Sequence, residues 1–398
     1  MNLLVVSTWF PFPPNNGSKI RSFHLLQELA TRYVVTLLSF AEPGDEQHLS
    51  VLRPYCKTIE TVPGNPTKVA AAKLSSLFGE VPRSYQEAFS PAMDALVRKH
   101  LPQSDVAMAL QIASSLYLRG RGPTPRLLEE LEVSILRDPV LRETRPIPRL
   151  RRQLTWWKLA SFARRLVTEF DHTTVVSDLE RDCLVSLGCD EARISVVPNA
   201  VDGAHLTRLR GPVDGDQIIY PGALTYGPNL DAVEWFLAEV LPLIHRVRPN
   251  TKLLVTGSVE GVNLGRLPQA EHVQFPGYVA DIKALVASCA ACIVPLRLGG
   301  GTRLKILEAM ALGTPVVSTS KGAEGLDLTP GNDLLVADTP EAFARAVVDV
   351  LDSPSLAESL RASARALIAR QYTWQHAGAR LCEQLDQLAP IAHGHRTH

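Results

Sequence analysis

The sequence lacks several features that would point to particular classes of protein. Its 41 Lys and Arg residues balance 41 Asp and Glu residues, so no net field favours nucleic acid or an acidic partner. No apolar run approaches the roughly 20 residues that a membrane-spanning helix needs. The first residues, MNLLVVSTWF, have neither the basic region nor the small-residue cleavage site of a signal peptide. We therefore expect a cytoplasmic protein without a nucleic-acid partner.

Cysteine is also scarce, and what there is does not suggest a metal. The six cysteines are scattered along the chain, and a disulfide framework is not expected in a protein of this length. Cys289 and Cys292 form a CxxC pair, but no second pair and no HxxxH motif accompany it. Small core residues are therefore favoured over a zinc or redox site. We expect no metal and no other cofactor.

Length and composition indicate a soluble globular protein with more than one domain. Apolar residues make up 45% of the chain and charged residues 21%, and its length corresponds to two or three domains. Apolar strands alternate with helical patterns, and this order restarts near residue 217. The expected strands are residues 3–7, 34–40, 106–110, 173–177, 218–222, 252–257, 273–275, 291–296, 315–318 and 334–336. The pattern predicts two doubly wound parallel sheets, facing across a cleft that holds the ligand.

The most informative segment is PLRLGGGTRLKILEAMALGTP, residues 295–315. A strand ends at Leu296, three glycines follow, and a helix then begins. Gly299, Gly300 and Gly301 would let the backbone approach a ligand, and N–H groups at the start of the helix would hold an anion. Neither a Walker loop nor a GxGxxG fingerprint is present. The alternative is a plain flexible loop.

Polar residues around these glycines suit a nucleotide. Thr302 completes the loop, and the charges of Arg297, Arg303 and Lys305 would stabilise a diphosphate. Glu308 lies on an apolar stripe of the helix, where a carboxylate needs a partner. A sugar diol would satisfy both of its oxygens. The alternatives are an internal salt bridge for Glu308 and solvated surface positions for the cations.

A second strand-to-helix turn, PPNNGSKIR at residues 13–21, follows the first strand. Gly17 would approach a ligand from the other side of the cleft. We place Asn16, Lys19 and Arg21 on the side of a second substrate. The alternative is an ordinary turn with a solvated Lys19 and Arg21.

Together these motifs resemble the GT-B glycosyltransferases of the GT4 type, and the resemblance covers most of the chain. It is carried by FPFPPNNGSKIRSFHLLQELA, SVVPNAVD, IIYPGALTYGPNLDAVEWF, FPGYVADI, PLRLGGGTRLKILEAMALGTPVVST, KGAEGL and YTW. It implies a Rossmann-like acceptor domain at 1–200, a Rossmann-like donor domain at 201–374, and a last helix within 375–398 that crosses back. The implied activity is metal-independent, retaining transfer of a sugar from a nucleoside-diphosphate sugar to a hydroxyl of a glycan, lipid-linked or small-molecule acceptor.

The resemblance also implies roles for individual residues of the donor domain. Gly222, at the end of the first strand of this domain, falls on the donor side, and Gly17 of the first domain is also expected to approach the donor. Base recognition is expected near Gly277, Tyr278 and Val279, through backbone atoms. Glu308 matches the second of two family glutamates and is expected to bind the ribose.

The sequence departs from the family pattern at several of these positions. The first family glutamate falls on Gly300, and the family's Arg and Lys fall about where Leu224 and Asn229 stand. We expect Arg303 to contact the diphosphate directly and Lys305 to contribute less.

The acceptor-domain histidine of the family is also missing. The comparable segment, LLEELEV at residues 127–133, contains none. Glu130 or Glu132 is expected to face the donor sugar in its place.

A basic stretch lies between residues 137 and 165, with Trp156 and Trp157 within it. Basic residues interleaved with aromatic ones are typical of segments that contact an anionic membrane surface or a lipid-phosphate acceptor. This would place the protein peripherally at the inner membrane face. The alternative is a solvated helix face with two core tryptophans.

Two other functions remain open on the same architecture. One is a nucleotide-sugar 2-epimerase, which needs groups poised for proton transfer at the sugar, and no clear set is present. The other is a non-catalytic protein that binds nucleotide sugars.

Overall fold

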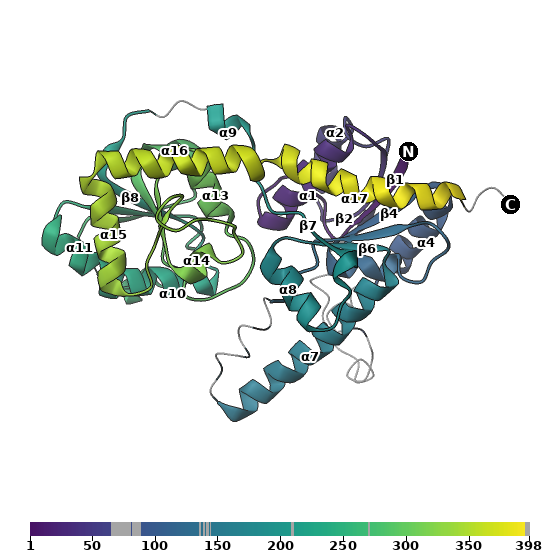
Figure 1. Cartoon of the computed structure of the whole chain (residues 1–398), viewed down its shortest axis with the longest axis horizontal. Coiled ribbons are helices and arrows are strands. Elements are labelled where there is room, and N and C mark those ends of the chain that lie inside the picture. The colour runs from purple at the N-terminus through teal and green to yellow at the C-terminus, as the bar shows by residue number, and fades with distance from the viewer. Residues whose placement is uncertain are drawn as a thin grey trace. The chain divides into compact units, whose positions relative to one another are not determined.

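The computed structural model of the chain describes residues 1–64, 81, 89–134, 137, 140, 143, 145–207, 211–269 and 271–394. Contacts divide the chain into two domains (Figure 1). The first domain is Met1–Asn199 together with the chain from Trp374 onward, and the second is Ala200–Thr373. Among the described helices, none is both long enough and apolar enough to cross a membrane.

The first domain is built on a seven-stranded parallel sheet, in the order β3-β2-β1-β4-β5-β6-β7. Its central strands are almost wholly apolar because helices cover both faces of a parallel sheet. The strand order reverses between β1 and β4, which makes their carboxyl ends the switch point of this sheet. The strands are β1 (Asn2–Ser7), β2 (Val34–Ala41), β3 (Thr58–Pro63), β4 (Val106–Leu110), β5 (Arg126–Glu129), β6 (His172–Val175) and β7 (Ile194–Val196).

Helices of very different length cover this sheet. The helix α1 (Gly17–Leu29) begins at Asn16, whose side chain accepts a hydrogen bond from the Lys19 amide at 3.0 Å. The helix α7 (Pro146–Glu169) is the longest at 24 residues. The other described α-helices of this domain are α2 (Leu49–Leu52), α4 (Pro91–His100), α5 (Gln111–Ser114), α8 (Asp178–Ser186) and α17 (Trp374–Gly394).

The second domain has a six-stranded parallel sheet in the order β10-β9-β8-β11-β12-β13. Here the order reverses between β8 and β11. Cys289 and Cys292 lie on β11 and are buried in the core, and all six cysteines of the chain are free. The strands are β8 (Asp214–Pro221), β9 (Lys252–Thr256), β10 (Val273–Gly277), β11 (Cys289–Val294), β12 (Val316–Ser318) and β13 (Leu335–Val336).

One helix expected in this domain, residues 231–244, is divided in the structure. A π-helical turn, Phe236–Val240, separates α10 (Gly227–Trp235) from α11 (Leu241–Val247). Pro242 has no N–H for the helical hydrogen-bond ladder, so α11 starts anew around it. The remaining helices are α9 (Ala204–Thr207), α12 (Ile282–Ser288), α13 (Leu304–Ala311), α14 (Ser320–Ala323), α15 (Pro340–Asp352) and α16 (Pro354–Gln371).

The fold class expected from the sequence, two doubly wound parallel α/β domains, is confirmed. Three strands were not expected, namely β3, β5 and β7. The strand β3 is an edge strand with a mostly half-buried TIETVP sequence, and β5 and β7 have only four and three residues. Such short or polar strands leave no apolar pattern to detect, because their pairing is decided by neighbouring strands.

The last helix, α17, packs against α1 of the first domain, and Figure 1 shows the two running side by side. Tyr33 donates its hydroxyl hydrogen to Asp386 at 2.6 Å, which ties the far end of α17 to the chain just after α1. The helices lie in close contact at Gly378, where a Cβ atom would lie 2.6 Å from Glu28 Cγ. A glycine is therefore needed at this crossing.

Replacing Gly378 by valine is expected to weaken this seam. The added atoms have no space beside Glu28, and overpacking of this kind costs roughly 1–3 kcal/mol in the free energy of unfolding. Urea denaturation followed by circular dichroism measures the effect. Ala379→Val, on the exposed side of the same helix, is the matched control for helix propensity. Equal stability of the two variants would contradict the close packing.

Candidate functional site

The loops at the switch point of the second domain bring together most of the residues expected on the donor side. One loop follows β8 and begins at Gly222, and the other follows β11 and runs from Pro295 to Arg303. A Cβ atom on Gly222 would lie 2.6 Å from Lys305 Nζ, so the absence of a side chain there makes room for the ammonium group. The carboxyl ends of β8 and β11 are thus the centre of this candidate site.

The glycine-rich loop has a defined backbone conformation. Gly299 and Gly301 have φ values of 93° and 80°, in the left-handed region that favours glycine. The Arg303 guanidinium folds back on this loop and donates hydrogen bonds to the carbonyl oxygens of Gly299, at 2.8 Å, and of Gly300. The side chain of Arg303 is buried, so its first effect is to fix the shape of the loop. The hydroxyl of Thr302 is buried there without a hydrogen-bond partner among the described residues.

Lys305 points into the space beneath Gly222. Its ammonium group donates to the Tyr220 hydroxyl at 3.0 Å and to Asn229 Oδ1 at 3.2 Å, and it lies 4.1 Å from the centre of the Tyr220 ring. Burial lowers the pKa of Lys305 to about 7. Asn229 is the position where the family pattern has a cation, and in the structure the cation of Lys305 lies directly beside it.

Glu308 lies on α13, one turn after Lys305, and is half-buried. Burial raises the pKa of its carboxyl group, and the charges of Lys283 and Lys305 oppose that shift. In the part of the chain that the structure describes, the carboxylate has no hydrogen bond and no ion pair within 4 Å. The internal salt bridge considered from the sequence is therefore not found in that part.

The remaining donor-side residues are placed differently from one another. Arg297 pairs with Asp231 of α10 at 2.7 Å, with its guanidinium above Trp235, so its charge is already balanced. Gly277, Tyr278 and Val279 lie at the carboxyl end of β10, the edge strand, two strands away from β8. Gly277 has a φ of 70°, and Tyr278 is 87% exposed.

In the first domain, Arg21 has an internal position instead of the expected contact with a second substrate. Its side chain is fully buried and pairs with Glu129 at the end of β5. The remaining donors reach the carbonyl oxygens of Val197 at 2.8 Å and of Pro198 at 3.1 Å, and Asn199 Oδ1 at 3.1 Å. A buried charge needs such partners, and all of them belong to the protein.

Two residues next to this ion pair have backbone conformations that are rare outside glycine. Glu130 has a φ of 60° and Gln111 a φ of 68°, at the carboxyl ends of β5 and β4. Gln111 Nε2 donates to Glu130 Oε2 at 3.1 Å, while Gln111 Oε1 is buried without a partner among the described residues. Burial, followed by the negative charge of Glu129, raises the pKa of Glu130 to about 8. Strain and a shifted pKa together are typical of functional positions.

Of this pair, Gln111 was missed by the sequence reasoning. Its backbone strain has no sequence signal, because glutamine is not a residue that favours a positive φ. Glu132, the other candidate of this segment, is half-buried, and its charge contributes to the raised pKa of Glu130.

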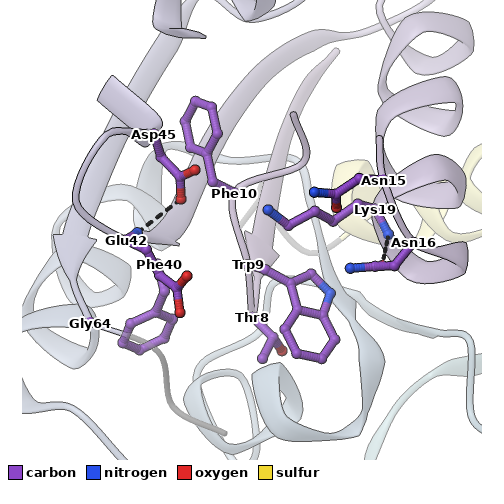
Figure 2. A pocket seen from close by; sticks show the side chains of 10 residues that line it. All are labelled: Thr8, Trp9, Phe10, Asn15, Asn16, Lys19, Phe40, Glu42, Asp45 and Gly64. Carbon is purple, nitrogen blue, oxygen red and sulfur yellow. Dashed lines mark hydrogen bonds between the residues drawn. The ribbon is translucent and has the colours of Figure 1, made fainter. Parts of the chain in front are cut away.

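The same edge of the first domain holds a pocket of about 280 Å³, formed by the loops that follow β1, β2 and β3 (Figure 2). Trp9, Phe10 and Phe40 give it aromatic walls, and Figure 2 shows the ammonium group of Lys19 pointing into it. Trp9 Nε1 is buried without a hydrogen-bond partner among the described residues. Asn15, Asn16, Glu42 and Asp45 add polar groups to the lining.

Gly17 is the first residue of α1 and is exposed, next to the pocket residue Asn16. Aromatic surface combined with amide, ammonium and carboxylate groups suits a ligand with both hydroxyl groups and an apolar face.

An Asp-x-Asp pair, Asp214 and Asp216, was overlooked in the sequence. It lies at the start of β8, at the amino edge of the sheet and away from the loops described above. Asp214 pairs with Lys252 at 3.0 Å and Asp216 with Arg248 at 2.6 Å. Over the described residues, no three His, Cys, Asp or Glu side chains are grouped so that they could hold a metal ion.

Comparisons with known proteins agree with this geometry. Residues 215–353 match the sequence model of the family "Glycosyl transferases group 1". An uncharacterised 44.6 kDa protein of the cps region of Klebsiella pneumoniae is 22% identical over 93% of this chain and 96% of its own length. A glycogen synthase of Mycobacterium tuberculosis is 28% identical over 53% of this chain, which spans about half of that enzyme. The crystal structure of Anabaena HepE in complex with UDP-glucose superposes with a TM-score of 0.66 at 15% identity, over 97% of this chain and all of the other.

The shifted pKa of Lys305 can be measured directly. After reductive methylation with carbon-13 formaldehyde, one dimethyl-lysine resonance is expected to titrate near pH 7, because burial disfavours the charged ammonium. This resonance should be missing in Lys305→Arg and present in Lys252→Arg, the control at a partly exposed lysine. Titration of every lysine in the ordinary range would show that Lys305 is better solvated than its position suggests.

Proposed function

We propose that this chain, a protein of the GT-B fold whose second domain is a group 1 glycosyltransferase domain, is a retaining, metal-independent hexosyltransferase of the GT4 type. It moves a sugar from a nucleoside-diphosphate sugar to the hydroxyl group of an acceptor. The observation that carries this proposal is the half-buried carboxylate of Glu308, which has no close partner in the described part of the chain and follows a glycine-rich loop at the switch point. That combination suits a ribose diol and a diphosphate bound side by side.

The donor is proposed to lie across the carboxyl ends of β8 and β11. The ribose hydroxyls donate hydrogen bonds to the Glu308 carboxylate, and N–H groups of the loop around Gly300 face the diphosphate. The nucleobase lies toward Gly277, Tyr278 and Val279. The bound UDP-glucose of Anabaena HepE supports a uridine nucleotide as the first donor to test.

Arg303 and Lys305 are proposed to have the reverse of the roles expected from the sequence. Arg303 donates two hydrogen bonds to carbonyl oxygens of the glycine loop and so positions the N–H groups that bind phosphate. Lys305 has one donor left after Tyr220 and Asn229 and supplies the positive charge for the diphosphate. As the bond to the anomeric carbon breaks, negative charge grows on the leaving diphosphate, and Lys305 stabilises it.

Retention requires the acceptor oxygen to attack the face that the diphosphate leaves. The new glycosidic bond forms at the anomeric carbon, and the hydroxyl proton passes to the departing diphosphate. The first domain contributes Glu130, whose carboxyl group is neutral below pH 8 and donates a hydrogen bond to a hydroxyl of the donor sugar. Gln111 holds Glu130 in place through the 3.1 Å hydrogen bond.

The acceptor is proposed to enter the pocket lined by Trp9, Lys19 and Glu42. A sugar-like acceptor satisfies such a pocket, because its apolar face packs on aromatic rings and its hydroxyls bind the polar groups. We place the reaction in the cytoplasm, at the inner face of the membrane, with a glycan, lipid-linked or small-molecule hydroxyl as acceptor.

Incubation with a panel of nucleotide sugars tests the activity, with and without EDTA. Slow release of nucleoside diphosphate that EDTA does not affect supports metal-independent transfer, and the anomeric configuration of a transferred product, read by NMR, supports or contradicts retention. Exchange into the 2-epimer would identify an epimerase. Binding without any turnover would identify a non-catalytic nucleotide-sugar-binding protein, and a strict need for divalent metal would overturn the proposed role of Lys305.

Glu308→Gln is expected to weaken donor binding about tenfold or more. The change keeps the shape of the side chain and removes its charge, and a hydrogen bond to a charged group contributes roughly 1.5–3 kcal/mol. Isothermal titration calorimetry with the nucleoside diphosphate measures it. Glu341→Gln, on the exposed start of α15, is the matched control. Unchanged affinity of the Glu308 variant would remove this residue from the donor site.

Ionisation of Glu130 is expected to make kcat fall at alkaline pH, as an alkaline limb of the pH profile. Its carboxyl group loses its proton as the pH rises through about 8, so a role that needs the neutral form is lost above that pH. Glu130→Gln is permanently neutral, and its kcat should no longer fall through that limb, while Glu130→Ala should lower kcat at every pH. Glu132→Gln is the control. An alkaline limb that persists unchanged in Glu130→Gln would assign it to another group, for which Lys305 is the next candidate.

A further inference from the structure

The helix α7 carries an apolar stripe that no described part of the chain covers. Ile147, Leu150, Leu154 and Trp157 have exposed fractions of 74%, 59%, 55% and 59%. They stand at positions i, i+3, i+7 and i+10, so they lie along one face of the helix. Large apolar side chains grouped in this way on a surface mark an interaction site, whereas single ones are common.

Only the second half of α7 is needed to complete the core. Leu159, Phe162 and Leu166 are buried in the core of the first domain, whereas the first half contributes only the half-buried Trp156. Figure 1 shows the first half of α7 extending beyond the sheet of its own domain. The apolar stripe is therefore not explained by packing within the domain.

The charged residues of this helix are almost all basic. Between Pro146 and Glu169 there are six basic residues and one acidic residue, which is Glu169 itself at the last position. Arg151 and Lys158 lie one turn before and one turn after Leu154, so they flank the stripe. Arg149 and Arg151 form no ion pair in the part of the chain that the structure describes.

We propose that the first half of α7 docks on an anionic membrane surface. Ile147, Leu150, Leu154 and Trp157 enter the interface between headgroups and acyl chains, and the flanking basic residues contact lipid phosphates. This inference goes beyond the proposed transfer reaction and names the surface by which the protein reaches a bilayer. It does not depend on which sugar or acceptor is used.

Charge favours a membrane over a second copy of this chain as the occupant. Two copies paired along this stripe would bring two strongly basic helices together, and like charges repel at such a distance. A bilayer with anionic lipids matches both features of the helix at once. A tryptophan at the end of the stripe also suits the interface, where an indole has an apolar body and a polar N–H.

Co-sedimentation of the full chain with vesicles tests the inference, in the absence of any nucleotide sugar. The chain is expected to bind vesicles of phosphatidylcholine mixed with phosphatidylglycerol at least tenfold more tightly than vesicles of phosphatidylcholine alone. High salt should weaken but not abolish this binding, since insertion of the stripe is not screened. Binding that does not depend on anionic lipid, or no binding at all, would overturn the proposal.

Variants test the apolar stripe and the flanking basic residues of α7 separately. Leu150→Ser with Leu154→Ser should reduce binding at least tenfold, and so should Arg149→Gln with Arg151→Gln. Arg246→Gln with Arg266→Gln removes the same charge from exposed positions of the second domain and should bind like the unmodified chain. If that control weakens binding equally, the attraction comes from overall charge and not from α7.

Further readouts exclude the other occupants and a folding defect. Trp157→Phe should remove a blue shift of tryptophan fluorescence that accompanies vesicle binding. Circular dichroism and release of nucleoside diphosphate in solution should be the same in all these variants, so a failure of the proposed activity leaves this test intact. A dimer in solution that Leu150→Ser dissociates would assign the stripe to a second copy. Full displacement from vesicles by soluble glycerol phosphate would show a headgroup site without insertion.

Discussion

The first domain depends on the fully buried guanidinium of Arg21. A charge in this position is tolerated only when every donor is satisfied, and removing one partner of such a pair costs several kcal/mol. Here the partners are Glu129 at the end of β5, the backbone carbonyls of Val197 and Pro198, and the side-chain oxygen of Asn199, after which the chain enters the second domain. Glu129 is thereby turned inward, and the chain continues through Glu130 with a positive φ. A structural ion pair thus fixes the residue that the proposed reaction needs from this domain.

The candidate site of the second domain contains two half-buried groups of opposite charge. Lys305 and Glu308 lie one turn apart on α13, and the same loss of solvent lowers the pKa of the first and raises that of the second. Both charged forms therefore cost free energy, and the proposed donor would offset that cost with an anion for Lys305 and hydrogen-bond donors for Glu308. The missing side chain at Gly222 makes this arrangement possible, because any Cβ atom there would displace the ammonium group.

The sequence predicted the architecture better than it predicted the side-chain contacts. Long apolar strands, the glycine-rich loop and the position of Glu308 all leave periodic or compositional signals, and the fold class inferred from them was right. The direction of a long side chain leaves no such signal. Arg21 looked like a surface cation and is buried, and Lys305 turned out to lie beside Asn229 because a space exists under Gly222 that only the folded chain reveals. The strain at Gln111 is likewise set by its neighbours and not by its own preference.

The net charge of the chain is zero, but its charged groups act in two different ways. Burial shifts the pKa of Lys305 and of Glu130 toward neutrality, so the charge of these two groups depends on pH there, and burial also raises the pKa of Glu308. Charges in such positions are little screened by salt. The basic residues along the first half of α7 are exposed, so their attraction to an anionic surface falls with salt. The proposed reaction at the sheet edges and the proposed attachment through α7 should therefore respond to different variables. A salt series at fixed pH acts mainly on attachment, and a pH series at fixed salt acts mainly on the reaction.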